Sequence, residues 1–284
     1  TLLKFDQPHP HRRELIFDID LNDYDFLDLH EGLPNPNGQP RPLSLEKCDH
    51  AWPVAGIAVK LLTRILRDHF GFGEFLCCYS GRRGVHLWVL DDRAMALNSD
   101  GRNAIANYVD FQYSKCKQRA SIGQRAFAKT HRLMDTVYEL FEDVLVAEMG
   151  VLCPMDARDD FLNRLGISTH ESMHNLHDEV ARKDSGMGAW AYIKTKVLGQ
   201  AKNHPKACGW FVNRLDETVL AYVWPRIDIN VTKGLNHLIK APFVAHPKTM
   251  RIAVPLQVRT VLDIFNPRQC PTVTTTNVPE GLHE

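Results

Sequence analysis

The chain has 284 residues, of which 44% are hydrophobic and 24% are charged. These values are ordinary for a globular protein and allow one large domain or two small ones. Lys and Arg together number 34, as do Asp and Glu, so the net charge is zero and a protein that coats nucleic acid non-specifically is excluded. A basic run over 115–132 could contact phosphate locally, although a solvated helix face explains it equally well.

Seven cysteines without a Cys-x-x-Cys pair do not follow the pattern of a disulfide framework. Cys77 and Cys78 lie in an apolar strand pattern, which is typical of buried free thiols, so we expect an intracellular reducing compartment. No apolar run is long enough to span a bilayer and no signal-peptide pattern opens the chain, so no membrane partner is expected. Because the chain begins at Thr1, just before a strand pattern, we expect a fragment of a longer protein.

The first half of the chain combines strands with one clear helix. Alternation of apolar and polar residues predicts a strand over 14–19. Prolines with Asn-Pro and Asn-Gly pairs then predict a long loop over 28–50, and an apolar stripe predicts a helix over 53–70. Strand patterns recur at four later places: 74–79, 85–90, 226–231 and 251–255.

The middle of the chain is mostly helical, from 93 to about 222. One long helix is marked by apolar residues over 127–145, and a short helix is predicted over 233–240. Residues 272–284, with a run of threonines, are expected to be a frayed end. We therefore predict an α/β core built from both ends of the chain, 1–92 and 222–284, around a helical insertion subdomain, 93–221.

Two carboxylates share a face of the first strand. Asp18 and Asp20 lie two residues apart, so their side chains point the same way from positions about 7 Å apart at Cα. Carboxylates placed in this way can hold a pair of metal ions about 3.5–4 Å apart, and magnesium prefers such oxygen ligands. The alternative is two ordinary acids facing solvent. The apolar neighbours Phe17 and Ile19 argue against it, because burying unpaired carboxylates without a cation is costly.

A third carboxylate, Asp228, shares a predicted strand face with Arg226 and Asn230. It could complete the ligands of a two-metal site. An ordinary salt bridge between Arg226 and Asp228, without any metal, is the alternative.

Basic residues form two further candidate sites, which could both bind phosphate. In the turn that begins at Ser80, Gly81 and Gly84 permit the backbone to lie close to a ligand, while Arg82 and Arg83 offer fixed positive forks and His86 a further donor. A basic surface hairpin is the alternative. Later in the chain, an Ala-Pro-Phe turn is bracketed by two cationic or titratable residues, Lys240 and His246. The alternative is that these are ordinary solvent-exposed side chains.

Three stretches together resemble a known family: FDIDLNDYD (17–25), SGRRGVH (80–86) and RIDINVTKGLNHLIKAPFVAHPKT (226–249). In order and in composition they are similar to the signature motifs of the archaeo-eukaryotic primases, in particular the small catalytic subunits of eukaryotic-type DNA primases. The resemblance covers 11–28, 70–92 and 222–265. It implies an α/β (α+β) fold, a mixed-sheet catalytic core with an inserted helical subdomain.

The resemblance also assigns roles to the candidate residues. It implies that three catalytic carboxylates hold two Mg²⁺ or Mn²⁺ ions, namely Asp18, Asp20 and Asp228. It implies that six residues bind the nucleotide and its triphosphate, namely Ser80, Arg82, Arg83, His86, Lys240 and His246.

The implied activity is that of a DNA primase, a nucleotidyltransferase that joins ribonucleoside triphosphates on a single-stranded DNA template into a short RNA primer during DNA replication. The implied partners are NTPs, the template and the primer, the primase large subunit and, through it, a replicative DNA polymerase. The implied location is the nucleus. Relatives usually carry a cysteine-rich zinc knuckle after the first motif. Here that stretch offers only His30, Cys48 and His50, fewer than the four ligands that structural zinc usually takes, so the sequence favours a site without zinc.

Three other functions remain open from the sequence. A repair or translesion primase-polymerase of the same superfamily would prefer dNTPs, and the long match of the third motif favours the replicative primase over it. A non-catalytic scaffold that binds nucleic acid would not need the complete set of three carboxylates. A metal-dependent phosphodiesterase could use those carboxylates, but it has less use for a basic turn and a Lys/His pair around a triphosphate.

Overall fold

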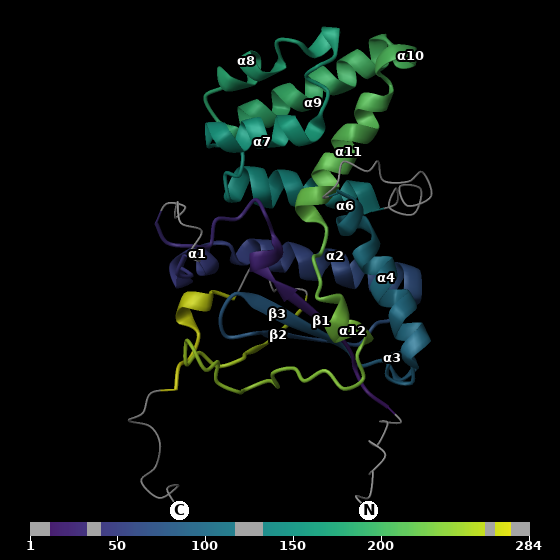
Figure 1. The fold of residues 1–284 in the computed structure, drawn as a ribbon, viewed down its shortest axis with the longest axis vertical. Coiled ribbons are helices and arrows are strands. Elements are labelled where there is room, and N and C mark those ends of the chain that lie inside the picture. The colour runs from purple at the N-terminus through teal and green to yellow at the C-terminus, as the bar shows by residue number, and fades with distance from the viewer. Residues whose placement is uncertain (1–11, 33–40, 117–132, 259–264, 274–284) are drawn as a thin grey trace, which may run out of the picture.

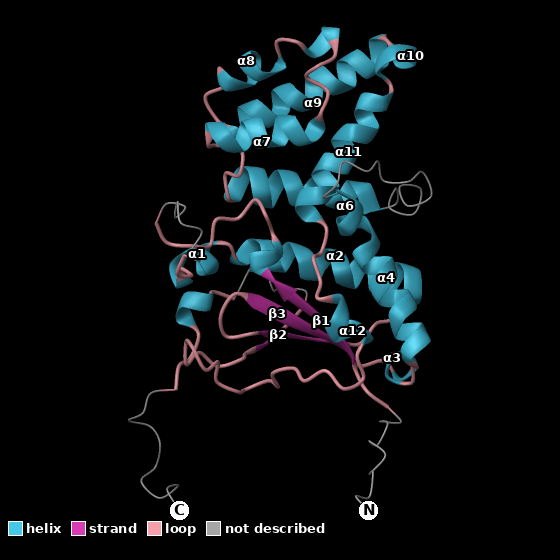
Figure 2. Cartoon of the chain, in the orientation of Figure 1, coloured by secondary structure: helices cyan, strands magenta, loops and turns pink. Residues whose placement is uncertain are grey.

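The computed structural model describes residues 12–32, 41–116, 133–258 and 265–273. A small sheet lies at one end of the molecule, and helices are stacked on one of its sides (Figures 1 and 2). The other side of the sheet is crossed by the largely irregular segment that follows residue 233 (Figure 2). Within the described ranges, no helix is both long enough and apolar enough to cross a membrane.

The sheet has four strands in the order β1-β3-β2-β4. Their bounds are β1 Leu15–Asp20, β2 Phe75–Tyr79, β3 Gly84–Val89 and β4 Pro255–Leu256. This combination of helices with a separate sheet confirms the predicted α+β class. The described strands pair only in the antiparallel sense, whereas a mixed sheet was expected. Antiparallel pairing lets β2 and β3 be joined directly by a tight turn, which places that turn beside the end of β1.

The alternation predicted for β1 is confirmed. Leu15, Phe17 and Ile19 are fully buried, whereas Asp18 and Asp20 lie half-buried on the opposite face. The buried face packs against α2 (Trp52–Phe70), the helix that the sequence predicted over 53–70. A proline in its first turn and Gly71 in the left-handed conformation after its last residue set the two ends of this helix.

The helical region contains the elements α3 Asp92–Met95, α4 Ser99–Cys116, α6 Met134–Glu139, the π-helix Leu140–Glu148, α7 Met155–Leu165, α8 Leu176–Ala181, α9 Gly186–Asn203, α10 Pro205–Cys208 and α11 Trp210–Val223. Short 3₁₀ turns cover Leu21–Asp23, Glu171–Met173 and Pro267–Gln269. Apolar side chains of these helices and of one face of the sheet belong to one continuous core. The other face contributes Ile16, Cys78 and Trp88 to a smaller cluster with Val231 and Ala253. The division into a core and a helical subdomain over 93–221 stays a prediction.

Several sequence predictions differ from the structure. The predicted loop over 28–50 ends in a helix, α1 (Leu45–His50), because Ser44 caps its first turn. The helix predicted over 127–145 begins outside the described residues and, where it is described, changes into a π-helix at Leu140. Most of the basic run over 115–132 and of the end over 272–284 also lies outside the described residues.

The third motif folds differently from its prediction. Residues 226–231 do not form a strand: Asp228 caps a short helix, α12 (Ile229–Lys233), by accepting a hydrogen bond from the backbone N–H of Asn230 at 2.9 Å. Asp readily makes this local bond, which favours a helix start over an extended chain. The predicted helix over 233–240 is absent, and the strand predicted over 251–255 is reduced to isolated bridges followed by β4.

Candidate active site

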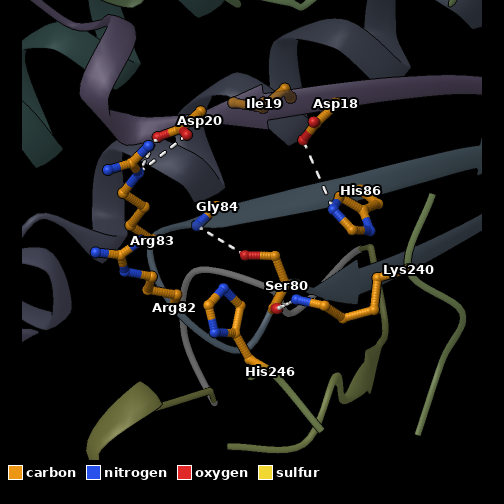
Figure 3. A pocket seen from close by; sticks show the side chains of 10 residues that line it. All are labelled: Asp18, Ile19, Asp20, Ser80, Arg82, Arg83, Gly84, His86, Lys240 and His246. Carbon is orange, nitrogen blue, oxygen red and sulfur yellow. Dashed lines mark hydrogen bonds and ion pairs between the residues drawn. The ribbon is translucent and has the colours of Figure 1, made fainter. Parts of the chain in front are cut away.

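A polar pocket of about 170 Å³ opens where the end of β1 meets the β2–β3 turn and the segment after α12 (Figure 3). Its walls combine carboxylates from one strand with cationic and hydroxyl groups from the turn. Nine residues were predicted for the site, and the structure brings eight of them to this pocket: Asp18, Asp20, Ser80, Arg82, Arg83, His86, Lys240 and His246. Ile19 and Gly84 complete the lining.

The antiparallel register of β1 and β3 explains why the first two motifs meet. Asp18 lies opposite His86 and Asp20 lies opposite Gly84, so the carboxylates project beside the turn (Figure 3). The Nε atom of Arg83 is 2.9 Å from one carboxylate oxygen of Asp20 and 2.7 Å from the other. Asp20 also accepts a hydrogen bond from the backbone N–H of Asn22 at 2.8 Å, which begins a 3₁₀ turn. Asp20 is therefore well paired.

Asp18 is held in a less favourable environment. Burial, followed by the negative charges of Asp20, Asp228 and Asp23, raises its pKa to about 7, while Lys240 opposes this shift. The nearest ring atom of His86, Nε2, is 3.7 Å from the Asp18 carboxylate, which is too far for a hydrogen bond. An unliganded Asp18 thus carries charge at a substantial electrostatic cost.

The third predicted carboxylate lies close to the first, although it is outside the pocket lining. The backbone N–H of Asp228 donates to the backbone oxygen of Asp18 at 2.9 Å, and the two side chains interact electrostatically. The alternative salt bridge with Arg226 is not the arrangement that forms, since Arg226 pairs with Asp25 at 2.7 Å. In the described part of the chain, no three Asp, Glu, His or Cys side chains converge closely enough to ligate one ion.

The turn between β2 and β3 is fixed by backbone hydrogen bonds. The N–H of Ser80 donates to the Gly84 oxygen at 2.9 Å, and the N–H of Gly84 donates to the Ser80 hydroxyl at 3.2 Å. Gly81 has φ +87°, and a Cβ there would lie 2.8 Å from the Cβ of His246. A Cβ on Gly84 would overlap the carbonyl oxygen of Ile19. Both glycines are therefore required sterically, and they bring the turn against β1 and the later segment.

The later segment contributes two further side chains. Lys240 donates to the backbone oxygen of Ser80 at 2.7 Å, and its burial lowers its pKa. The backbone N–H of His246 donates to the Arg251 oxygen at 2.8 Å. Burial lowers the pKa of His246 to about 4, with Lys240 and Arg82 acting in the same direction. Burial likewise lowers the pKa of His86 to about 4. At pH 7 both histidines are neutral before a ligand binds, so the arginines and Lys240 provide the positive charge.

Sequence reasoning missed the residues that support the turn from behind. Arg251 makes a two-pronged ion pair with Asp49 of α1, with distances of 2.6 and 2.8 Å, and donates to the Tyr79 hydroxyl at 3.1 Å. Tyr79 donates in turn to the backbone oxygen of Arg82 at 3.1 Å, and Thr249 donates to the Gly81 oxygen at 2.6 Å. No local signal pairs Asp49 with Arg251, since 202 positions separate them.

The residues considered for zinc, His30, Cys48 and His50, do not line the pocket. His30 forms an isolated bridge with Leu43, and His50 is the last residue of α1. Cys48 is buried in the same helix, and burial raises its pKa to about 11, which disfavours the thiolate that a metal requires. The question of zinc in this stretch stays at the level of the sequence prediction.

Known proteins resemble this chain along most of its length. A family model described as DNA primase small subunit matches residues 17–258. The DNA primase small subunit of Schizosaccharomyces pombe is 30% identical over 269 residues, which cover 93% of this chain and 56% of that protein. For the Drosophila melanogaster protein of the same description the identity is 30%, covering 97% of this chain and 61% of the relative. The Saccharomyces cerevisiae protein of the same description is 26% identical, over a match that covers 91% of this chain and 60% of that protein. The chain thus spans less than two thirds of the length of each.

Proposed function

The chain belongs to the DNA primase small-subunit family, and on that premise we propose that it carries the catalytic site of a DNA primase. The proposed reaction is template-directed nucleotidyl transfer, in which ribonucleoside triphosphates are joined on single-stranded DNA into a short RNA primer for DNA replication. One observation carries the proposal above the others. A pair of strand carboxylates and a glycine-bounded basic turn line the same pocket, as the transfer of a nucleotide from a triphosphate requires.

The basic side of the pocket suits the triphosphate. Arg82, Arg83 and Lys240 would neutralise the phosphate oxygens as charge develops on the leaving pyrophosphate. His86 and His246 are neutral at pH 7 without a ligand, so they would donate hydrogen bonds first and gain charge only as the bound phosphates raise their pKa values. The Ser80 hydroxyl already bonds within the turn and would help to hold its shape.

The carboxylate side suits divalent cations. Two Mg²⁺ or Mn²⁺ ions held by Asp18, Asp20 and Asp228 would supply Lewis-acid stabilisation of the attacking 3′-oxygen and of the leaving group. Support for this assignment comes from Asp18, whose half-buried carboxylate is crowded by other negative charges that a cation would compensate. Asp20 would have to exchange its ion pair with Arg83 for such a cation, and this exchange would release Arg83 toward the triphosphate.

A partner is expected to supply the grip on the template. The net charge of zero predicts weak, salt-sensitive binding of single-stranded DNA by this chain alone. We therefore assign it a heterodimeric arrangement with a primase large subunit, which would also connect it with a replicative DNA polymerase in the nucleus.

The decisive experiment separates nucleotide binding from chemistry. Calorimetry with ATP and Mn²⁺ should show binding that depends on the metal, and dinucleotide synthesis should occur on a poly-pyrimidine template with ATP or GTP. Asp18→Ala should abolish synthesis, whereas Asp178→Ala, which removes an exposed carboxylate of α8, should leave it unchanged. Full synthesis by Asp18→Ala would refute the proposal. Preferential incorporation of dNTPs would instead indicate the repair primase-polymerase.

A further inference from the structure

One aromatic side chain stands out in the segment that supplies Lys240 and His246. Phe243 is 74% exposed, and it is the most exposed aromatic side chain in the part of the chain that the structure describes. Trp210, on α11, follows with 43%. Three further large apolar side chains of the same segment are exposed, namely Leu238, Val244 and Met250. One exposed apolar side chain is ordinary on a protein surface, but several in one segment are typical of a binding surface.

The backbone of this residue is unusual as well. Phe243 has φ +68°, in the left-handed region that bulky residues rarely adopt. It is held there because its N–H donates to the Ala253 oxygen at 2.7 Å, while the N–H of Ala253 donates to the Val244 oxygen at 2.9 Å. Met250 shares both features, with φ +57° and 40% exposure. Strained residues of this kind concentrate at ligand sites, where the surrounding structure maintains them.

The charge of the segment from Lys240 to Ala253 indicates which kind of ligand would bind there. Phe243 lies three residues after Lys240 and three before His246, and both of these line the pocket (Figure 3). Lys240, Lys248 and two arginines of the turn all act electrostatically on His246. From Ile229 to Leu262 the sequence contains no Asp or Glu. An exposed aromatic ring therefore borders a region of positive charge.

We propose that Phe243 is a stacking platform for a base of the single-stranded DNA template, placed at the edge of the nucleotide pocket. An aromatic face combined with positive charge that follows the backbone is how proteins bind single-stranded nucleic acid without reading its sequence. Val244 and Met250, also exposed, would extend the apolar surface beside the ring. This inference rests on the proposed primase function and adds to it the residue that would hold the template beside the incoming nucleotide.

The test measures binding alone, so that it does not depend on primer synthesis. Fluorescence anisotropy of a labelled oligo(dT) is compared with that of an abasic oligodeoxynucleotide of the same length, at one fixed salt concentration. Phe243→Ala should weaken binding of oligo(dT) by about five- to a hundredfold, the range expected for one lost base stack. Its affinity for the abasic strand should equal that of the unsubstituted chain. Phe243→Trp should preserve the affinity for oligo(dT), whereas Phe243→Leu should not.

Trp210→Ala is the matched control, because it removes the next most exposed aromatic side chain of the described residues, at the end of α11 that Figure 1 shows far from the sheet. It should leave both affinities unchanged. Equal affinities of Phe243→Ala and the unsubstituted chain for oligo(dT) would overturn the proposal, as would an equal loss for both strands. If a protein partner, and not DNA, bound at Phe243, then Phe243→Ala and the unsubstituted chain would have equal affinities for oligo(dT). If the chain bound bases through Phe243 but made no dinucleotide, the proposed function would be refuted. The inference that Phe243 stacks on a base would still hold.

Discussion

The turn from Ser80 to Gly84 and the carboxylate face of β1 line one pocket, but the fold holds them by different means. The turn is closed by its own backbone hydrogen bonds and is supported from behind by Tyr79, Thr249 and Arg251. On β1, by contrast, only Asp20 has a close cationic partner, and Asp18 is half-buried among other negative charges. The backbone of the turn is satisfied without a ligand, whereas the Asp18 carboxylate is not.

This difference indicates which side of the pocket lowers the stability of the protein in order to serve function. Donors that the fold already positions need little rearrangement when an anion arrives, which is the property that electrostatic catalysis depends on, although Arg83 must first leave Asp20. Crowded carboxylates lower the stability of the empty protein, and they are retained where a ligand compensates them. The two sides can be tested separately, because removing the charge of Asp18 should raise stability, whereas removing the carboxylate partner of Arg251 behind the turn should lower it.

The largest effect is expected for Asp18→Asn. The amide is nearly isosteric but carries no charge, so nucleotidyl transfer should fall by about 10²- to 10³-fold. The same substitution should raise the free energy of unfolding by about 1 kcal/mol, because it removes a crowded negative charge. Single-turnover synthesis and urea denaturation of one protein preparation measure both quantities.

Asp20→Asn is the matched control for this prediction. It removes the same charge two residues away, but it also removes the ion pair with Arg83, so it should reduce activity and stability together. A loss of stability in Asp18→Asn as large as that in Asp20→Asn would show that crowding by other carboxylates does not destabilise Asp18.

On the side of the turn, the buried pair of Asp49 and Arg251 should matter most for stability. Asp49→Asn leaves the Arg251 guanidinium, which is 11% exposed, without its carboxylate, and this should cost about 3 kcal/mol. The affinity for nucleotide should also decrease, because Arg251 holds Tyr79 and, through it, Arg82. Denaturation and calorimetric titration with ATP are the measurements.

Two variants sharpen this result. Replacing both partners, with Asp49→Leu and Arg251→Met, should recover much of the stability, since an apolar pair of similar volume avoids the desolvation cost. Glu46→Gln on the same helix should change stability little, because Glu46 is 82% exposed and 3.7 Å from Arg268. If Asp49→Asn were as mild as Glu46→Gln, the pair would not support the turn.

A third prediction concerns Gly84, where the two walls touch. In Gly84→Ala the new methyl group would overlap the Ile19 carbonyl oxygen, so β1 and β3 must separate at the carboxylate end, at a cost of about 1–3 kcal/mol. Gly199→Ala provides the control, because a Cβ there meets nothing within 4 Å and the residue lies inside α9. That substitution should stabilise the protein slightly. Equal midpoints of thermal unfolding for the two variants would contradict the steric argument.

The sequence predicted the parts of the site that depend on local pattern. Strand alternation placed Asp18 and Asp20 on one face, as the structure confirms. The glycines of the turn were expected to let the backbone approach a ligand; in the structure they allow it to approach β1 and His246, and the ligand stays a prediction. Asp228 was placed on a strand wrongly, because its apolar neighbours follow a strand period while its own side chain caps a helix. The capping bond is a local competitor that hydrophobic periodicity does not register.

Other features could not be predicted from one sequence because they depend on distant contacts. The pairing of Asp49 with Arg251, and of Asp20 with Arg83, requires knowledge of which elements meet. The neutral state of His86 and His246 at pH 7 follows from burial, which local spacing does not give. The transition from α6 to a π-helix likewise has no simple signal in the pattern of apolar residues.

The smallest effect is expected at Asp25, which contrasts with Asp18 on the neighbouring strand. Burial alone would raise the pKa of Asp25, but Arg226 and Arg164 more than offset it and hold the pKa below the ordinary value of 3.8. The ionised form is favoured in the folded state, so its contribution to stability is present above about pH 4 and is lost as the pH falls below that value. Because the side chain is 38% exposed, solvent screening limits the contribution to about 1 kcal/mol.

Urea denaturation at a series of pH values between 2 and 7 measures this contribution. Asp25→Asn should flatten the acid limb of the stability profile, whereas Asp178→Asn, at an exposed position of α8, should leave it unchanged. An acid limb of the same depth in Asp25→Asn and in the unsubstituted chain would mean that the two arginines do not stabilise this carboxylate. The contrast with Asp18 would then fail, because a carboxylate with cationic partners and one crowded by anions should respond to acid in opposite ways.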